Sequence, residues 1–453
     1  MFNRSLPPRQ QRSKFILLWF VILLVSSLIG LPLPTRAAPA SPNQAFLAVQ
    51  FNPHDRLVRS ISFSGSITGL DALLQSGLKV ETKDYSWGKA VCSIEGVGCP
   101  ATDCFCGGST FWNYEYWDGN QWQSHSTGAS DYTVQNGDVE GWRWGEWTDR
   151  PILPWPQLDS ARKALDWLRS QQNSDGGFGS VSSSVEAALA IGSNHEAAKD
   201  WRIASDAKTL ADYLTTQSES YSRLSAASAG KLSVAMVKSG MRYPDNAKKP
   251  NAYYDNANGQ FGDGSALNQS WALLGTLALE ETVPDDAISY LKSIVKNNEG
   301  WGWSLDRGVD TNTTALALQS LLANHEMSCQ PLIRSVLAYL HKAQNDDGGF
   351  PYDLKSTSST PSDADSTAYV LQALYALGED PTSDAWKKNG NSPLDFLTSL
   401  QLSDGSFKWT AKEDGDKLRA TQQAIPALLG RPMPFTTTGV DPCWNTFMPV
   451  INR

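Results

Sequence analysis

Basic residues are scarce in this chain of 453 residues. Its 38 lysines and arginines are outnumbered by 47 aspartates and glutamates, which gives a formal net charge of −9. No lysine or arginine cluster follows the first 14 residues, so a nucleic-acid-binding surface is not expected. The partners that this composition favours are small or neutral molecules.

Familiar catalytic signatures are missing as well. The chain has only five histidines, and it contains no His-Glu-x-x-His helix, no Gly-x-Ser-x-Gly elbow and no Gly-Cys-Gly-Glu-Gln thioester. His325 and Cys329 come nearest to a zinc-binding set, but no Asp-x-Cys accompanies them. Two such residues rarely suffice for four-coordinate zinc, so no metal site is predicted.

Only one long hydrophobic run occurs, Phe15–Leu33, between a basic N-terminus and the small residues Ala37–Ala40. This pattern predicts a signal peptide over residues 1–40, with cleavage near Ala37 or Ala40. The run is also long enough to persist as a membrane anchor, since a span needs about 17–25 residues. We therefore expect a secreted or surface protein, with membrane contact only through an uncleaved signal.

Cysteine is sparse, with six residues, four of which lie within fifteen positions: Cys92, Cys99, Cys104 and Cys106. In an exported chain they predict two local disulfides, and three pairings are open. A zinc site is the alternative, although the spacing lacks paired Cys-x2-4-Cys knuckles. Cys329 and Cys443 are left either free or joined to each other.

Residues 41–150 read as a small α+β domain. Alternation over 60–67 predicts a strand and 70–78 a short helix, while 111–117, Asp118-Gly119 and Trp122 predict a hairpin. Further strands are expected at 132–134 and 139–147. Several tryptophans exceed what a small core needs, and those facing outward could stack on a ligand or cover the next domain.

A resemblance follows from Leu70-Asp71-Ala72-Leu73, the cysteine-rich turn, Phe111-Trp112-Asn113-Tyr114, Gly128-Ala129-Ser130 and Gly137–Trp142. These segments resemble the β-grasp-like domain that accompanies the helical domain of transcobalamin and intrinsic factor. The resemblance makes Trp112, Trp117 and Trp142 candidate ligand contacts.

Pro151, Pro154 and Pro156 mark a stiff linker over 151–157. From 158 to 430 a motif recurs, Gln-x3-Gly-x-Phe, at Gln172, Gln344 and Gln401. Weaker copies give a period of about 40–55 residues, as in paired-helix repeats. We expect the glutamine to satisfy backbone groups at the turn and the aromatic to fill the seam between copies.

Hydrophobic patterning separates two kinds of helix in the repeats. Residues 332–340 have one apolar face, whereas 315–322 and 369–377 are apolar nearly all round. The sequence therefore predicts a mainly α protein: an α/α toroid of five to six helix pairs, inner helices within outer ones, after the small N-terminal domain. The third outer helix, near 245–250, is expected to be short or irregular. Residues 431–453 are expected to form a tail that either docks on the toroid or serves surface attachment.

The Gln-x3-Gly-x-Phe/Trp pattern resembles the superfamily of terpenoid cyclases, protein prenyltransferase β-subunits, the complement thioester domain and the cobalamin carriers. The resemblance specifies the fold more than the function, because this fold serves enzymes and binding proteins alike. The cobalamin carriers combine a toroid with a small β domain, although here the order is inverted. They imply cobalamin as a bound ligand, and no cofactor is otherwise expected.

Polar residues recur where the inner helices are expected to start, at the mouth of the ring. We interpret this column chiefly as helix caps, with a further hypothesis that some members and their neighbours contact a ligand. The column comprises Ser183, Asn268, Asn312, Asp365 and Arg419, and the candidate ligand contacts of the toroid are Glu186, Asn268, Gln269, Trp271, Asn312, Asp365 and Gln422.

The string Asp363-Ala364-Asp365-Ser366 is similar to the Asp-x-Asp-Asp of class II terpenoid cyclases, which implies Asp365 as the proton donor. Ser366 replaces the last aspartate, and the sister copy Asp310-Thr311-Asn312-Thr313 shows that the first aspartate belongs to the repeat. Asp363 and Asp365 are therefore only weak catalytic candidates. The preferred hypothesis is an exported, non-enzymatic binding protein whose mouth and β domain hold a small ligand; the alternatives are an isoprenoid cyclase or prenyltransferase-like enzyme, and a cell-surface structural module.

Overall fold

The N-terminal part of the computed structural model is a five-stranded mixed sheet with a smaller sheet beside it. The model describes residues 42–149, 151–354 and 360–435, so the predicted signal peptide and Cys443 lie outside it. The main sheet has the order β2-β1-β8-β6-β7, with β1 and β8 parallel and the other pairs antiparallel. Its strands are β1 (Asn43–Asn52), β2 (Asp55–Phe63), β6 (Phe111–Trp117), β7 (Trp122–Ser124) and β8 (Val139–Gly145).

Helix α1 (Gly69–Gln75) and an antiparallel sheet of β3 (Val80–Tyr85), β4 (Gly88–Ile94) and β5 (Val97–Gly98) complete the N-terminal domain. The predicted α+β class and the hairpin at 111–124 are confirmed. The strand expected at 132–134 is wrong, because this segment makes only an isolated bridge between Thr133 and Thr68. A capping box of Thr68 and Asp71 begins α1 and satisfies free amides of its first turn.

All four clustered cysteines form disulfides, as Cys92–Cys104 and Cys99–Cys106. The alternative of a zinc site is therefore wrong, and the described residues contain no cluster of histidine, cysteine and acidic side chains that could hold a metal. Cys329 is also disulfide-bonded, which removes the possibility that it is free.

Removing the buried disulfide is expected to loosen β4. The double change Cys92→Ala and Cys104→Ala deletes a cross-link between positions 12 residues apart. Such links typically contribute about 2–4 kcal/mol by restricting the unfolded chain. Hydrogen exchange of the β4 amides should become faster, whereas exchange in the toroid should not change. Unaltered protection of β4 would contradict the expectation.

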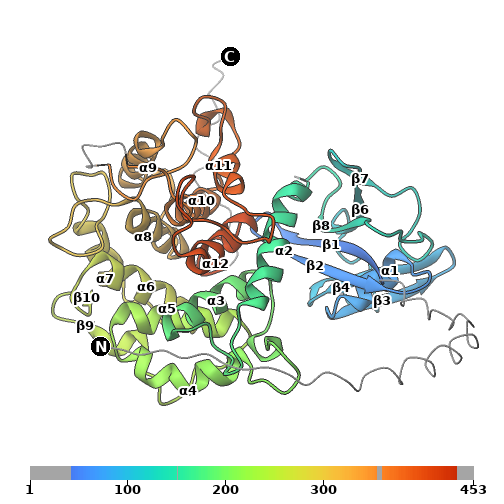
Figure 1. Ribbon diagram of the computed structural model, residues 1–453, viewed down its shortest axis with the longest axis horizontal. Coiled ribbons are helices and arrows are strands. Elements are labelled where there is room, and N and C mark those ends of the chain that lie inside the picture. Colours follow the sequence, from blue (N-terminus) through green and yellow to red (C-terminus); the bar gives the residue numbers. More distant parts are fainter. Residues whose placement is uncertain (1–41, 150, 355–359, 436–453) are drawn as a thin grey trace, which may run out of the picture. The chain divides into compact units, whose positions relative to one another are not determined.

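Six inner helices form a closed ring in the second part of the chain (Figure 1). Each packs against the next, and the last packs against the first. In chain order they are α3 (Val181–Ser193), α5 (Ala226–Lys238), α6 (Ala266–Ala278), α8 (Thr311–Ala323), α10 (Ala364–Leu377) and α12 (Lys417–Leu428). The predicted α/α toroid is confirmed, with the ring made of six inner helices.

Outer elements precede each inner helix, and five of the six are α-helices. They are α2 (Trp155–Ser170), α4 (Leu210–Ser222), α7 (Asp285–Ser293), α9 (Pro331–Ala343) and α11 (Pro393–Ser399). Between α5 and α6 the outer position holds only the 3-10 turn η2 (Pro250–Tyr253), which agrees with the irregular third element expected from sequence. Helix α2 begins at Trp155, three residues before the expected start of the repeats.

Short elements fill the loops of the toroid. They are the 3-10 turns η1 (Ala198–Asp200) and η3 (Asp384–Trp386) and the two-stranded ribbon β9 (Tyr254–Asp255) with β10 (Gln260–Phe261). None of the helices among the described residues is both long and apolar enough to cross a bilayer.

Glycines allow α5 and α6 to approach unusually closely. A Cβ atom on Gly230 would lie 2.0 Å from the carbonyl oxygen of Trp271, and one on Gly275 would lie 2.4 Å from the Cα of Gly230. The two helix backbones are therefore in direct contact at the one pair in the ring that has no outer α-helix between them.

Candidate functional site

The recurring glutamine is a structural residue that links successive repeats. The Nε2 group of Gln344 donates to the carbonyl of Gly348 in its own turn and to that of Trp386 in the next unit. Gln172 repeats this pattern with Gly176 and Trp201. Gln401 donates to Gly405 and to Ser160 of the first outer helix, so the same bond helps to close the ring.

The aromatic residue after each glycine turn is fully buried, as expected for a seam. Its backbone amide donates a hydrogen bond to a polar side chain near the start of the following inner helix, which ties the seam to that helix. The pairs are Phe178 with Ser184, Phe261 with Gln269, Trp301 with Thr314, Phe350 with Thr367, and Phe407 with Thr421. Gln269 also donates to Ala287 and is thus architectural, not a ligand contact.

The interpretation of the polar column as helix caps is wrong. The residues whose side chains cap the inner helices stand two or three positions earlier: Ser180, Ser225, Ser265, Asp310, Asp363 and Asp416. Asp363, for example, accepts from the amide and hydroxyl of Ser366. Column members such as Asn312 and Asp365 are therefore free to point elsewhere.

A cavity of about 390 Å³ opens among the N-terminal ends of the inner helices. Five of the seven residues predicted as ligand contacts in the toroid line it: Glu186, Trp271, Asn312, Asp365 and Gln422. The remaining lining includes Lys231, Trp303, Tyr352, Tyr369, Arg419 and Gln423. We call this space the mouth cavity.

Asp365 is the most perturbed acid of the mouth cavity. Burial raises its pKa to about 7, the nearby Asp363 adds to the rise, and Arg419 opposes it. Its Oδ1 atom is buried without a hydrogen-bond partner among the described residues. A carboxyl group with this pKa is about half protonated at pH 7 and mostly protonated below it, so Asp365 can donate a proton or a hydrogen bond into the cavity.

An ion pair lies on another wall of the cavity. Lys231 of α5 bonds to Oε1 of Glu186 of α3, and Gln423 of α12 donates to the same oxygen over 3.3 Å. The Lys231 ammonium also lies 5.1 Å from the ring centre of the buried Trp271. Burial lowers the pKa of Lys231, but Glu186, Tyr369 and Tyr221 together raise it by more, and the pKa ends above its ordinary value.

Two aromatic side chains stand at the rim. Trp303 and Tyr352 line the mouth cavity and are 45% and 40% exposed, although both are large and apolar. They lie in the loops that precede α8 and α10. An aromatic rim with a charged interior suits a ligand that has both apolar and polar surfaces.

The other predicted contacts lie elsewhere. Asn268 accepts from Ala227 and donates to Asp263, so it joins α6 to α5 and its own loop. In the N-terminal domain Trp112 and Trp142 are buried in the core, where Trp112 donates to Val97 and Trp142 stacks on Tyr114. Trp117 packs edge-on against Trp122. None of these residues lines the mouth cavity.

The N-terminal domain contacts the opposite ends of the inner helices. The described residues from Asn43 onward form one compact unit. Within it, Val58 and Arg59 of β2 bond to Asn194, at the C-terminal end of α3, and Arg56 donates to Leu429 after α12. A helix of 13 residues is about 20 Å long, so these contacts lie far from the mouth at the helix N-termini.

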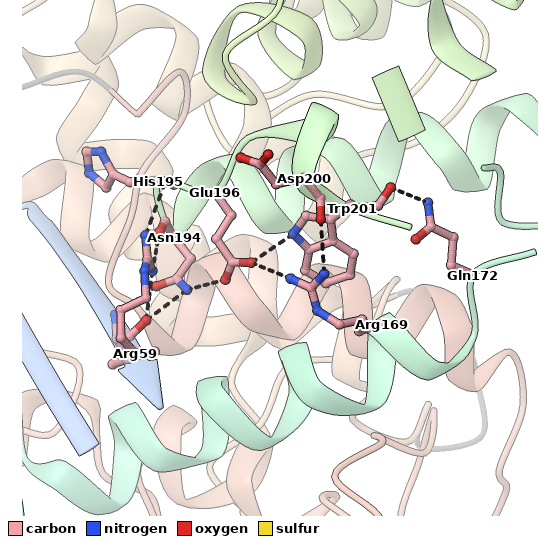
Figure 2. Close-up of polar contacts among 9 residues, drawn as sticks. Arg59, Arg169, Gln172, Asn194, His195, Glu196, Asp200 and Trp201 are labelled. Atoms are coloured by element: carbon pink, nitrogen blue, oxygen red, sulfur yellow. Dashed lines mark hydrogen bonds and ion pairs between the residues drawn. The ribbon is translucent and has the colours of Figure 1, made fainter. Parts of the chain in front are cut away.

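Figure 2 shows how the contact continues into the outer layer. Asn194 donates to Glu196, whose carboxylate pairs with Arg169 at 3.0 Å and accepts from the indole of Trp201 at 2.8 Å. The network fixes the contact between β2 and the first repeat. It contradicts the hypothesis that the N-terminal domain helps to form the mouth.

The chain after α12 turns into the ring. Residues 431–435 are all buried, and the amide of Met433 donates to Oε1 of Gln319, in the middle of α8. Arg431 forms an ion pair with Asp55 of β2. This part of the predicted tail docks on the toroid interior, and the remaining residues, 436–453, lie outside the described structure.

A second cavity, of about 710 Å³, lies between the β1–β2 turn, the proline linker and the end of α10. Its buried side chains Arg56 and Gln157 already donate to the carbonyls of Leu429 and Leu428, and the buried Gln50 accepts from Arg56. The mouth cavity is the stronger candidate, because it combines a perturbed acid with unpaired polar atoms.

Sequence reasoning missed Lys231, Gln423 and the two rim aromatics. Lys231 had a usable signal, since a lysine inside the apolar run of 226–238 is unusual for a buried helix. Trp303 and Tyr352 follow the seam aromatics Trp301 and Phe350 by two residues, a position that only the fold shows to be at the rim.

A closed ring of paired helices with a cavity at one end defines the class of α/α toroid proteins. The chain matches the prenyltransferase alpha-alpha toroid domain over residues 150–216, 267–361 and 336–429, just over half of its length. It therefore belongs to the prenyltransferase alpha-alpha toroid family. No curated protein matches it.

Several solved structures are similar in fold. A variant of the type II terpene cyclase MstE from Scytonema is 16% identical, with a TM-score of 0.40, covering 61% of this chain and 99% of that chain. A protein from Actinoplanes is 15% identical, with a TM-score of 0.41 and coverages of 60% and 99%. A glycosidase variant with bound glucose is 10% identical, with a TM-score of 0.41 and coverages of 61% and 98%. These likenesses concern the fold alone.

Proposed function

We propose that the mouth cavity is a general-acid site in which Asp365 protonates a compact substrate. The observation that carries this proposal is an aspartate with a pKa of about 7 and an unpaired oxygen on a cavity of about 390 Å³. An acid works best when its pKa lies near the working pH. Two further observations support a terpenoid cyclase-like reaction. The chain belongs to the toroid family, and Asp365 stands at the position of the middle aspartate in the Asp-x-Asp-Asp motif.

The test uses two substrate panels, because the family alone does not define the substrate. The full chain is incubated with acyclic isoprenoids (farnesol, geranylgeraniol and squalene) and with nitrophenyl glycosides, and products are identified by mass spectrometry. Turnover that falls as the pH rises through about 7 supports the proposal. Turnover that is independent of pH between 5 and 9 contradicts it.

A second candidate is binding without turnover, which the Lys231–Glu186 pair favours. A cationic intermediate formed from an isoprenoid needs a dry, apolar wall, whereas this wall carries a buried ion pair and two glutamines. Isothermal titration with the same compounds separates the two, since this candidate expects heat of binding but no product.

Cobalamin is the ligand first expected for such a binding protein. A corrinoid held between two domains would need residues of both around one cavity, but the described lining of the mouth cavity comes entirely from the toroid. Incubation with cyanocobalamin followed by gel filtration tests this directly, because a retained corrinoid is visible by its absorption.

A further inference from the structure

The hydrogen-bonding atoms of the mouth cavity define the chemistry of its ligand. Three buried oxygens there have no partner among the described residues: Oδ1 of Asn312, Oε1 of Gln423 and Oδ1 of Asp365. They come from α8, α10 and α12, three consecutive inner helices, so they lie along one stretch of the ring. A buried acceptor left unpaired costs about 1–3 kcal/mol, and a ligand that donates hydrogen bonds would recover this cost.

Glu186 adds a fourth acceptor. The bonds from Lys231 and Gln423 both end on its Oε1 atom, and no described contact uses Oε2. The side chain retains 13% exposure and lines the cavity. Bonding on one oxygen holds the carboxylate in place and leaves the other oxygen available to a hydroxyl group of a ligand.

A hydrocarbon does not match this set. It would bury three unpaired oxygens and an ion pair against apolar surface without supplying a single donor, and unpaired polar groups are costly in such surroundings. An anionic ligand is also disfavoured, because Glu186 faces the cavity and both cations of the lining are already paired, Lys231 with Glu186 and Arg419 with Asp416 at 3.8 Å.

The aromatic surfaces limit the ligand further. Trp271 and Tyr369 line the interior, and Trp303 and Tyr352 stand at the rim. Flat aromatic faces pack well against the C–H faces of saturated rings, while polar side chains form hydrogen bonds with the groups around the ring edge. A pyranose ring has both features: apolar faces, and hydroxyl donors around its edge.

We infer that the mouth cavity binds a saccharide unit, with its hydroxyls on Glu186, Gln423, Asn312 and Asp365 and its apolar face on Trp303. The inference rests on the proposal that the mouth cavity is the functional site, and it replaces an isoprenoid by a hydroxylated ring as the ligand. A cavity of about 390 Å³ lies at the lower end of the usual range for small-molecule sites, which suits a ligand of one or two rings.

The experiment measures binding by the full chain with calorimetry and saturation-transfer NMR. The probes are methyl glucosides, methyl galactosides, N-acetylglucosamine, cellobiose and maltose, with farnesol and geranylgeraniol as the second arm. We expect at least one saccharide to bind, Trp303→Ala to weaken it at least tenfold, and Gln423→Leu to weaken it severalfold. Trp147→Ala is the matched control, because Trp147 is 63% exposed in the N-terminal domain and should leave binding unchanged.

Each outcome has a distinct meaning. Saccharide binding that depends on Trp303 and Gln423 supports the inference. If an isoprenoid binds in a way that depends on Trp303 and Gln423 and no saccharide binds, the saccharide inference is wrong, but the mouth cavity remains the binding site. Binding that neither variant alters, or no binding of either class, overturns both the saccharide and the site.

Discussion

Replacement of Asp365 by asparagine is expected to lower turnover by roughly 10²–10⁴-fold, the usual contribution of a general acid. The change keeps size and polarity but removes the transferable proton. Asn312 occupies the equivalent position of α8, so an asparagine is compatible with this helix turn. Turnover is measured with whichever compound of the two panels is converted.

The same variant should be more stable than the parent at alkaline pH. Burial raises the folded-state pKa of Asp365 from 3.8 to about 7, so the folded state binds an extra proton between these values. Stability supplied by that proton is present below about pH 4 and is lost as the pH rises to about 7. Asparagine cannot ionise, so Asp365→Asn does not lose this stability as the pH rises. At pH 8 the free energy of unfolding of the variant should exceed that of the parent by up to about 4 kcal/mol, at 1.36 kcal/mol per pKa unit.

Urea unfolding at pH 5 and pH 8 checks the stability effect, and Asp346→Asn is the control. Asp346 is an exposed acid on the glycine turn of the same repeat, so its replacement should change neither stability nor turnover. Full turnover in Asp365→Asn would refute the general acid. A gain in stability that does not depend on pH would refute the assigned pKa shift.

Substitution of Gly230 by alanine is expected to destabilise the toroid by about 3 kcal/mol or more. The added Cβ would lie 2.0 Å from the carbonyl oxygen of Trp271, a backbone atom that moves only if α6 moves. Overpacking typically costs about 1–3 kcal/mol, and here a backbone atom lies in the way. Because Lys231 and Trp271 lie on these two helices, any displacement also reaches the mouth cavity.

The measurement is urea unfolding followed by circular dichroism at 222 nm, which reports mainly on the toroid helices. Gly128→Ala is the matched control, since its added Cβ would have no atom closer than 3.9 Å. A Gly230→Ala protein as stable as this control would show that α5 and α6 can separate at no cost.

The toroid could be predicted because its signals are local. Gln344, Gly348 and Phe350 each serve the turn in which they stand, so their spacing survives in several copies. The inner helix α5 is harder to register from sequence, because it is followed by η2 in place of an outer helix and lacks the motif. Lys231 escaped notice for the same reason.

The candidate site could be predicted only in part. Caps and cavity residues are drawn from the same small polar types, so sequence cannot tell Asp363 from Asp365; the helix start, set by backbone geometry, separates them. Alternation in 111–117 identifies two faces of a strand, but it does not show which face another element covers. The sequence therefore predicts Trp112 as a ligand contact, whereas the structure places it in the core.

The inward turn of residues 431–435 determines how a ligand can enter and leave the ring. Met433 occupies the interior at the level of Gln319, so among the described residues this segment blocks the ring there and leaves a cup that opens at the mouth cavity. A ligand must enter and leave by the same route, past Trp303 and Tyr352. A long polymer cannot thread through such a cup, and only a chain end or a free small molecule can reach Asp365.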